Sequence, residues 1–569
     1  MADIGWREWS SSSFREARRR QVPVLLSIVS PWFDACRRMD ISTYSDSRVV
    51  TFVEGNLVPI RVDALDRPDL VSRYAHSLPP VTAFLTPDGH LLTAAGFLDA
   101  AQLLSAIERV VLYYRDNKAQ IEREVAERER RALLASEPQN PITPGAVRRV
   151  EESILRWVES ELSLKLAPDA VHLLHLRYWR TGSEVYSGAI RKLLTSWASS
   201  PLFDKVDGGF FHHVSKPDFS DLELSKTCAD NAGAIEAYAV ATKLYNGAQF
   251  DIILRQTCRW VSSTLLDERT GGFFAGQLPD ADYYVKGRRG HAARPRALAK
   301  IYVAPCAAMA RALIDAALVT GERELGRRAL SAGELLWREC YDPNSGMAHR
   351  LEPLLAERKF GFLADQLSML DLLLRIYEVG GHPLHLQRAV ELGGLIEALY
   401  EDPQGGFYDR TPEEDDIGHL KFRKKSAVEN GRVAMLFYKL GALTHNDHFK
   451  EVAAAALWRF TSRLDELGPI AAQVALACDV HLGGITEAVV IGSRDNPAAS
   501  RLRIAVLELF SPAVALGTID PTDESTLRIR DVTFRGKPVG YVFHGGERLG
   551  PIEHPEEFRE EVLGRVRGK

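Results

Sequence analysis

The stretch that decides the fold is residues 22–40, which read VPVLLSIVSPWFDACRRMD. Its first half is a short apolar run rich in β-branched residues, which predicts a buried strand. A Ser-Pro-Trp turn follows, and a helix-forming stretch begins near Phe33. Two cysteines spaced as Cys-x-x-Cys at such a helix start would form a redox dithiol. This chain has Cys36 but carries Phe33 at the other position, so the segment cannot close a disulfide within itself.

The residues around this stretch alternate predicted strands and helices. Residues 58–63 and 81–85 are short, apolar and β-branched, and residues 86–89 (TPDG) supply a turn. This alternation is typical of a small α/β layer domain, which we place at residues 1–118. Residues 119–141 are a charged run ending in proline and asparagine, which predicts a solvated helix and a linker.

A helical theme then repeats as far as residue 465. Three loops share a glycine pair before an aromatic residue, at Phe210, Phe273 and Phe407. A glycine pair permits a tight turn, and the buried ring anchors the loop. The recurrence predicts an array of helical hairpins at 142–465, which could close into an (α/α)6 barrel or remain an open solenoid. Residues 466–569 return to strands and helices and predict a second small α/β unit.

The composition restricts the class of protein. The chain has 569 residues, 46% of them hydrophobic and 26% charged, and a net charge of −5, as expected for a globular protein of several domains without nucleic-acid partners. No apolar run approaches the ~20 residues that cross a bilayer, and the first residues lack a secretion signal. Six scattered cysteines indicate reduced thiols. We therefore expect a cytoplasmic protein without a membrane partner.

Neither a metal nor a cofactor is predicted. His212 and His213 are adjacent, so on a strand they would point to opposite faces. His172 and His175 share a helix face but lack an evident third ligand. The glycines of the tail are too sparse for a dinucleotide-binding fingerprint.

Two segments carry a family resemblance. Residues 58–69 (VPIRVDALDRPD) resemble V-x-V-D-R-E-E-R-P-D, and residues 80–89 (PVTAFLTPDG) resemble W-P-L-T-V-F-L-T-P-D-G. Both patterns are typical of thioredoxin-domain proteins fused to a six-hairpin glycosidase-like barrel, the spermatogenesis-associated thioredoxin-like family. The resemblance runs essentially end to end. It implies a thioredoxin-like α/β domain, an all-α (α/α)6 barrel and a C-terminal α/β unit, with Pro80 as a cis-proline beside the dithiol position.

The departures from that family fall on its chemical motifs. C-H-W-C-H-x-M becomes residues 33–39, FDACRRM, and H-F-E-K-M-L-Y-D-N-A becomes residues 223–232, ELSKTCADNA. D-W-N-A becomes residues 304–307, APCA, and G-F-L-D-D keeps one of its two acids in residues 361–365, GFLAD. E-N-x-x-A survives from Glu429, whereas the tail element C-x-G-x-x-C has lost both sulfurs. These losses imply relaxed or redirected chemistry.

The surviving acids near predicted helix starts are the catalytic candidates of the barrel: Asp230, Asp365 and Glu429. Sugar-processing barrels use two carboxylates, one as an acid and the other as a base or nucleophile. Helix capping is the competing interpretation of each one. The ligand-binding candidates are Asn231, Asp282, Asn430, Phe210, Phe273 and Phe407.

Two further features have a functional and a structural interpretation. Cys36, beside Arg37 and Arg38, could be a lone nucleophile with a lowered pKa or an inert buried cysteine. The basic cluster at residues 286–296 could hold a phosphate or an acidic partner, or be a solvated loop.

We therefore predict a divergent family member without dithiol redox activity, acting as a binding or scaffold protein. The barrel would hold a polar small molecule, with sugars as one class, and the thioredoxin-like domain would contact a protein partner. Two alternatives stay open. One is a carbohydrate-processing enzyme of epimerase or glycosidase type that uses the barrel acids, and the other is monothiol chemistry at Cys36.

Overall fold

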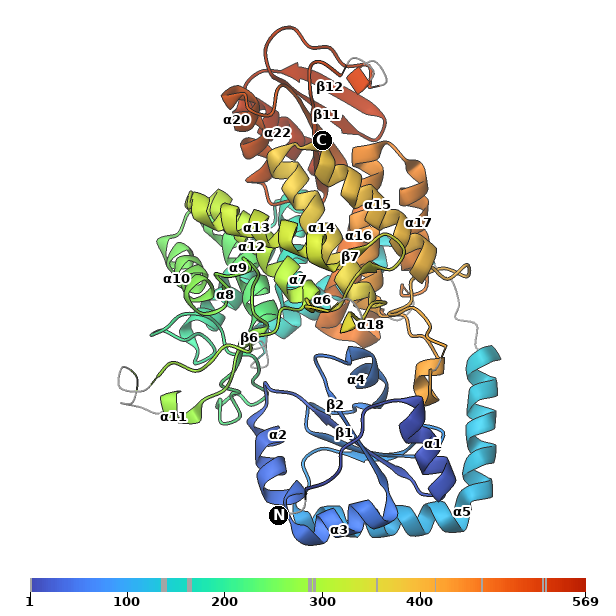
Figure 1. Ribbon diagram of the computed structural model, residues 1–569. Coiled ribbons are helices and arrows are strands. Elements are labelled where there is room, and N and C mark those ends of the chain that lie inside the picture. The colour runs from blue at the N-terminus through green and yellow to red at the C-terminus, as the bar shows by residue number, and fades with distance from the viewer. Residues whose placement is uncertain are drawn as a thin grey trace.

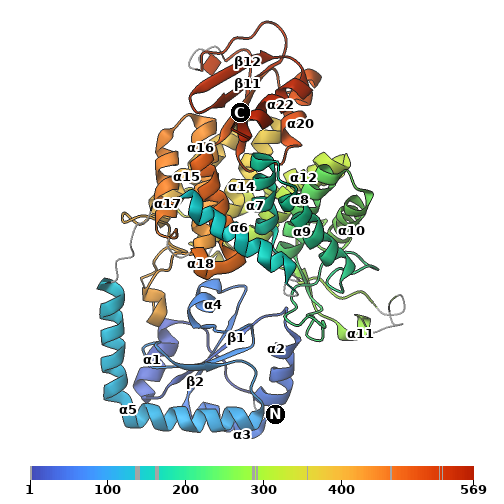
Figure 2. The same ribbon diagram turned by 180° about the vertical axis from the view of Figure 1, so that it is seen from behind.

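The computed structural model describes residues 3–134, 141–160, 166–284, 289, 293–354, 357–414, 416–461, 464–523, 526–527 and 530–568. An N-terminal α/β domain, a helical barrel and a C-terminal α/β unit are stacked along one direction (Figure 1), and the view from behind shows the same order (Figure 2). The barrel therefore has a neighbour at each end.

The N-terminal domain has the predicted thioredoxin-like layout. Its described strands form a sheet of order β2-β1-β3-β4, in which β1 pairs parallel with β2 and antiparallel with β3. The strands are β1 (Val24–Val29), β2 (Val58–Asp63), β3 (Val81–Leu85) and β4 (Leu91–Ala95). The Pro79–Pro80 peptide bond, directly before β3, is cis, at the position named from the sequence.

Five α-helices of the described chain surround this sheet: α1 (Ser11–Arg20), α2 (Asp34–Met39), α3 (Ser47–Asn56), α4 (Pro68–Tyr74) and α5 (Ala100–Leu134). The apolar β1 is buried between them, as its β-branched sequence predicts. Helix α5 continues across residue 118, where we had placed a boundary, with a single non-helical residue at Asn117. Most of the predicted linker, residues 135–140, lies outside the described residues.

The barrel is closed rather than open. Within the described residues, six inner helices pack side by side in a ring, each on the next and the last on the first: α7 (Pro168–Thr181), α9 (Cys228–Tyr245), α12 (Val303–Thr320), α14 (Leu363–Gly380), α16 (Ala427–Thr444) and α19 (Ala472–Gly483). Outer helices cover them: α6 (Pro144–Glu159), α8 (Glu184–Ser199), α10 (Ala248–Thr264), α13 (Arg323–Cys340), α15 (Pro383–Tyr400) and α17 (Asp447–Trp458). Helix α6 begins the barrel and pairs with α19, which closes the (α/α)6 ring.

The inner helices are apolar on most faces because protein surrounds them. Helix α12 is the extreme case, since its length and composition alone would suit a membrane span. Helix α19 lies beyond residue 465, where the sequence analysis ended the barrel. No glycine-glycine-aromatic loop precedes it, so the repeat signal that marked the other hairpins is missing there.

The C-terminal unit covers the C-terminal ends of the inner helices. Its sheet has the order β10-β9-β11-β12, built from β9 (Thr486–Ile491), β10 (Val514–Ile519), β11 (Val539–His544) and β12 (Glu547–Ile552), with α20 (Pro497–Leu507) and α22 (Pro555–Val566). The Arg530 side chain donates to the Leu443 carbonyl at 2.9 Å, and the Tyr377 hydroxyl to the Thr518 carbonyl at 3.4 Å. These contacts tie the unit to α16 and α14.

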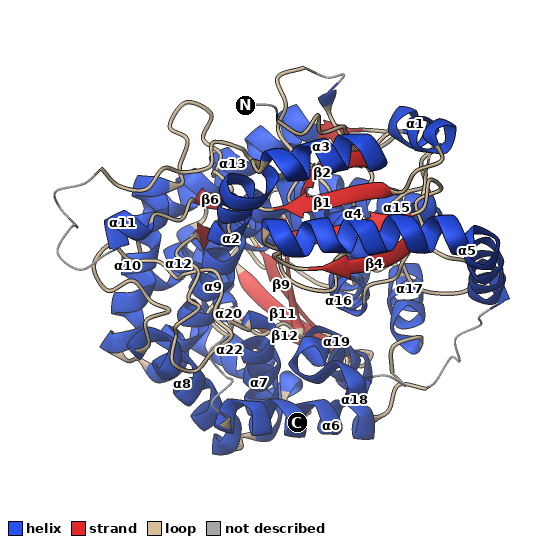
Figure 3. Ribbon diagram, turned by 90° about the horizontal axis from the view of Figure 1, so that it is seen from below, coloured by secondary structure: helices blue, strands red, loops and turns tan. Residues whose placement is uncertain are grey.

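The N-terminal domain covers the opposite end of the barrel, where the inner helices begin; seen from below, it lies across the ring (Figure 3). A barrel loop containing the short helix η3 (Gly418–Lys421) reaches back into this domain. Ile417 and Leu420, 8% and 2% exposed, belong to the same core cluster as Phe14 and Tyr74. The two domains therefore share a hydrophobic core.

Candidate functional site

The face on which a thioredoxin-like domain would carry its dithiol is buried against the barrel. Cys36 is 5% exposed and packs with Trp32 and Phe33 of its own domain and with Ala275 and Tyr302 of the barrel. The approach is close, since a Cβ on Gly276 would lie 3.0 Å from the Trp32 ring. A partner disulfide has no room to reach the Cys36 sulfur in this arrangement.

The electrostatics of Cys36 agree with its burial. Burial raises the pKa of the Cys36 thiol to about 11, against a smaller opposing effect of the Ser30 N–H, which donates to Sγ at 3.4 Å. Arg37 and Arg38 pair instead with Asp34, at 2.9 and 3.4 Å. The hypothesis of a thiol with a lowered pKa is therefore wrong.

The barrel loops are held by a feature that repeats at the start of four inner helices. The fourth residue of each helix binds the backbone of the preceding loop. The Phe210 N–H donates to Asn231 Oδ1 at 2.7 Å, and the Phe407 N–H donates to Asn430 Oδ1 at 2.7 Å. In the same way the Met347 N–H donates to Gln366 Oε1, and the Phe273 N–H donates to Cys306 Sγ. Asn231 and Asn430, both fully buried, thus brace loops.

The other ligand-binding candidates lie away from any shared site. The Phe210, Phe273 and Phe407 rings are at most 1% exposed, so a ligand could touch them only if the core opened. Asp282 is exposed on the short helix α11 (Ala281–Tyr284), at the outer edge of the barrel in Figure 1. The structure gives the rings a packing role and leaves Asp282 outside the barrel mouth.

A second repeat, one residue earlier on the same helices, places polar pairs at the barrel mouth. The third residues are Asp230, Pro305, Asp365 and Glu429. Each of the three acids interacts with the loop residue that lies two positions after the one bound by the fourth residue. His212 Nδ1 lies 2.6 Å from Asp230 Oδ2, and His349 Nδ1 lies 2.8 Å from Asp365 Oδ2. At α16 the corresponding pair is Asp409, from the preceding loop, and Glu429, from the helix. At α12 the corresponding residues are Ala275 and Pro305, which have no polar side chains. Sequence reasoning missed His349 and Asp409.

Asp365 and His349 form a buried pair that the N-terminal domain touches. Asp365 is 1% exposed and accepts a hydrogen bond from the Ala304 N–H at 3.1 Å. The second ring nitrogen of His349, Nε2, lies 2.7 Å from the Leu65 carbonyl of the N-terminal domain. Burial raises the pKa of Asp365. Burial also acts to lower the pKa of His349, but the Asp365 charge and the hydrogen bonds to the ring outweigh that effect, so the His349 pKa is raised. The pair therefore lies directly beneath the N-terminal domain, joined to it by the Leu65 carbonyl.

Glu429 is the most perturbed acid of the mouth. Burial raises its pKa to about 8, and the charges of Asp409 and Asp365 add to the shift while Arg432 and Arg73 oppose it. Its Oε2 atom is buried and has no hydrogen-bond partner within the described chain. Asp365 and Glu429 therefore share one environment. Asp230, on α9, pairs with His212 instead.

The stability of the fold should depend on the proton of Glu429. The folded pKa of about 8 lies above the ordinary 4.5, so the folded protein binds more protons between these values and loses stability as pH rises from about 4.5 to 8. We expect the free energy of unfolding, measured by urea titration at pH 5.5 and 9, to fall more in the wild type than in Glu429→Gln. The difference should be on the order of a few kcal/mol. Equal pH dependence in both proteins would contradict the raised pKa.

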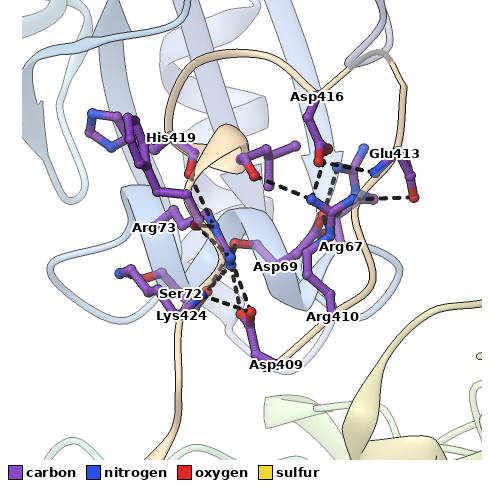
Figure 4. A network of polar contacts seen from close by, with 12 residues as sticks. Arg67, Asp69, Ser72, Arg73, Asp409, Arg410, Glu413, Asp416, His419 and Lys424 are labelled. Carbon is purple, nitrogen blue, oxygen red and sulfur yellow. Dashed lines mark hydrogen bonds and ion pairs between the residues drawn. The ribbon is translucent and has the colours of Figure 1, made fainter. Parts of the chain in front are cut away.

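A polar network closes the mouth between the N-terminal domain and the barrel (Figure 4). Arg73 of α4, with a fully buried side chain, donates to both oxygens of Asp409 at 2.7 and 3.1 Å and to the Phe422 carbonyl at 3.0 Å. Arg410 pairs with Asp416 at 2.7 Å and lies 3.8 Å from Asp69. On the side of the N-terminal domain these contacts come from Asp69, the last residue of the family-like segment 58–69, and from Arg73, four residues after it.

Asp66 makes a further bridge from the same segment. It accepts hydrogen bonds from the Tyr302 hydroxyl at 2.6 Å, from Lys300 at 3.0 Å and from Arg350 at 2.6 Å. The most family-like stretch of the sequence thus serves to dock the two domains.

Charged residues also occupy the barrel axis. We use "axial cluster" for Glu236, Arg311, Asp371 and Arg432, which lie on α9, α12, α14 and α16. Arg311 pairs with Glu236 at 2.6 Å and with Asp371 at 3.2 Å. Asp371 lies in the middle of α14, yet its side chain is 31% exposed, and that of Arg311 is 20% exposed. Because helices enclose these residues, their accessible surface indicates space on the axis, which we call the axial chamber.

The C-terminal unit closes the far end of this chamber. A cavity of about 60 Å³ lies there, lined by Arg311, Asp315 and Arg375 of the barrel and by Phe510 and Val514 of the C-terminal unit. A space of this size suits one or two waters. A ligand larger than this does not fit at that end of the chamber.

The remaining sequence candidates form no metal site within the part of the chain that the structure describes. In the described chain, no group of three His, Cys, Asp or Glu side chains is placed to hold a metal. Much of the basic cluster, including Lys286 and His291, lies outside the described residues. Of its described members, Arg289 pairs with Asp204 at 2.5 Å, and Arg294 lies 4.0 Å from Asp207.

Comparisons with known proteins agree with the fold. Residues 1–133 match the family Thioredox_DsbH, a protein family of unknown function also called DUF255. The chain is 22% identical to human spermatogenesis-associated protein 20 over 310 residues, which are 49% of this chain and 39% of that protein. It is equally similar, at 22% over 309 residues, to an uncharacterized protein of Caenorhabditis elegans, covering 49% of this chain and 41% of that one.

The matched segment spans about two fifths of the length of these relatives. Among solved structures, a D-mannose isomerase aligns with a TM-score of 0.45 and 12% identity, over 57% of this chain and 88% of that one. The chain thus joins an N-terminal domain that matches the family Thioredox_DsbH to an (α/α)6 barrel, and it is a distant relative of spermatogenesis-associated protein 20.

Proposed function

We propose that this protein is a redox-silent binding protein. Its thioredoxin-like domain is a fixed cap on the barrel, and the axial chamber beneath it holds a small polar molecule. The observation that carries the proposal is the burial of Cys36, Trp32 and Phe33 against the barrel, which removes the face that thiol exchange needs. The six cysteines are all buried and unpaired, which suits a reducing compartment such as the cytoplasm.

The chamber supports the binding part of this proposal. Charged groups of the axial cluster keep accessible surface in the interior, where an uncompensated charge is costly unless water or a ligand meets it. Polar groups that converge in an enclosed space are typical of small-molecule sites. A protein partner of the thioredoxin-like domain would have to use another of its faces, because the barrel already covers this one.

The test uses purified protein and a panel of D-mannose, D-glucose, myo-inositol, glycine and L-alanine, measured by calorimetry. We expect saturable binding of at least one compound and roughly tenfold weaker binding in Asp371→Asn, because that variant removes an accessible chamber charge. Glu324→Gln, on the exposed face of α13, is the matched control and should bind as the wild type does. Binding that Asp371→Asn leaves unchanged, or no binding, would overturn the chamber. Catalytic reduction of insulin disulfides would overturn the redox-silent cap.

A second candidate function is acid–base chemistry on a sugar. It is favoured by Glu429, which holds a proton near neutral pH, close to the proton-sharing pair of Asp365 and His349. Incubation with D-mannose and D-glucose, followed by proton NMR, tests it. Turnover that Glu429→Gln abolishes would establish an enzyme. The absence of turnover would leave the binding protein.

A further inference from the structure

The axial chamber presents two opposite charges that the protein itself does not pair with each other. Asp371 on α14 meets Arg311 at 3.2 Å and keeps nearly a third of its side-chain surface accessible. Arg432 on the neighbouring helix α16 is partly exposed and donates to the Ser368 hydroxyl at 3.2 Å. Among the described residues, no carboxylate lies within ion-pair distance of Arg432. Both groups therefore retain capacity for a charged partner.

Two carboxyls near Arg432 form no ion pair with it. Glu429, one turn earlier on the same helix, carries a proton near neutral pH, since burial raises its pKa to about 8. Asp169 on α7 is the second, and burial raises its pKa while the Arg432 charge lowers it. His172 also lies in this region, and its Nε2 atom is 3.4 Å from Glu236 Oε2. A partly buried guanidinium is best satisfied by a carboxylate, which it can bind through two parallel hydrogen bonds.

The walls of the chamber leave room for a compact ligand. On the turns nearer the mouth, two of the inner helices carry small, partly exposed residues: Ala304 and Ala308 on α12, and Ala364 on α14. These described wall positions carry no aromatic ring that could serve as a platform for a sugar. What the chamber offers instead is separated positive and negative charge.

We propose that the axial chamber binds a small zwitterion, an α-amino acid or a closely related amino-carboxylate, with its carboxylate on Arg432 and its ammonium group on Asp371. This inference rests on the proposed function, because it names the ligand class of the same chamber. A zwitterion satisfies both charges at once and brings no net charge into the interior. A neutral sugar would leave Arg432 without a charged partner and would add nothing to the single ion pair that Asp371 makes with Arg311.

Calorimetry on the full chain tests the ligand class with whole and half ligands. The whole ligands are glycine, L-alanine and L-glutamine; the half ligands are propionate and ethylammonium; the neutral probes are D-mannose and myo-inositol. We expect an amino acid to bind at least tenfold more tightly than either half ligand. Asp371→Asn and Arg432→Gln should each weaken it at least tenfold. Arg328→Gln, which removes an arginine paired with Glu324 on the outer helix α13, should bind as the wild type does.

The outcomes separate the two proposals. Half ligands that bind as tightly as the amino acid would overturn the zwitterion. Binding of a neutral probe without any amino acid would also overturn it, while leaving the chamber as a polar binding site. No binding by any compound would remove both proposals. The comparison of whole and half ligands uses the wild type, so it decides even if a charge variant fails to fold.

Discussion

Replacing Arg73 with alanine is expected to lower the free energy of unfolding by about 3 to 5 kcal/mol, because it leaves a largely buried carboxylate without its partner. Arg73 is fully buried and binds both oxygens of Asp409. It also donates hydrogen bonds to the carbonyls of His419 and Phe422, which lose this donor in the variant. The loss therefore combines a broken buried ion pair with unsatisfied backbone acceptors.

Urea unfolding followed by tryptophan fluorescence and circular dichroism measures this effect. Arg73→Lys keeps the charge but cannot bind two oxygens in parallel, so it should recover only part of the loss. Arg18→Ala removes an exposed ion pair with Asp88 and should cost less than about 1 kcal/mol. An Arg73→Ala protein as stable as Arg18→Ala would contradict the buried network of Figure 4.

Leu420→Ala is expected to cost about 2 to 5 kcal/mol and to weaken the N-terminal domain, although residue 420 belongs to the barrel. Leu420 is 2% exposed and packs in the core that contains Phe14 and Tyr74. Truncation removes apolar contact and leaves a cavity in that core. An equally large side chain on the surface has neither effect, so Leu354→Ala, at a residue 60% exposed, is the matched control.

Hydrogen exchange locates the damage. We expect the amides of β1 and β3, which are more than 300 residues away in sequence, to exchange faster in Leu420→Ala than in the wild type. This readout tests the shared core directly, since a loop that merely rests on the surface would leave those strands protected. Unchanged protection in β1 would show that the two domains fold independently.

The fold was largely readable from the sequence because its signals are local. The β-branched strands, the proline before β3 and the glycine-aromatic loops each reflect nearby residues. Helix α19 shows the limit of local signals: it completes the ring, but no glycine-aromatic loop precedes it in the sequence. The loop before α14 carries Met347 where the others carry phenylalanine, which hid the equivalence of His349 and His212.

The candidate site was less predictable because it is made by docking. Asp365 and Glu429 were identified as acids near helix starts, and the structure brings them together. Arg73 and Leu65 bind the neighbours of these acids, Asp409 and His349, from a segment some 300 residues away, a contact that no local pattern encodes. Cys36 shows the same limit, since its arginine neighbours suggest a reactive thiolate, whereas their guanidinium groups turn to Asp34.

The most direct measurement of the central claim, a thioredoxin-like domain fixed with its thiol face against the barrel, is the alkylation rate of Cys36. Native protein is treated with iodoacetamide at pH 7.5, and peptide mass spectrometry follows Cys36, with glutathione and the urea-unfolded chain as references. A thiol pKa near 11 in place of about 9 predicts a rate roughly a hundredfold below the unfolded reference, and burial slows it further. Alkylation of native Cys36 as fast as glutathione would contradict the account.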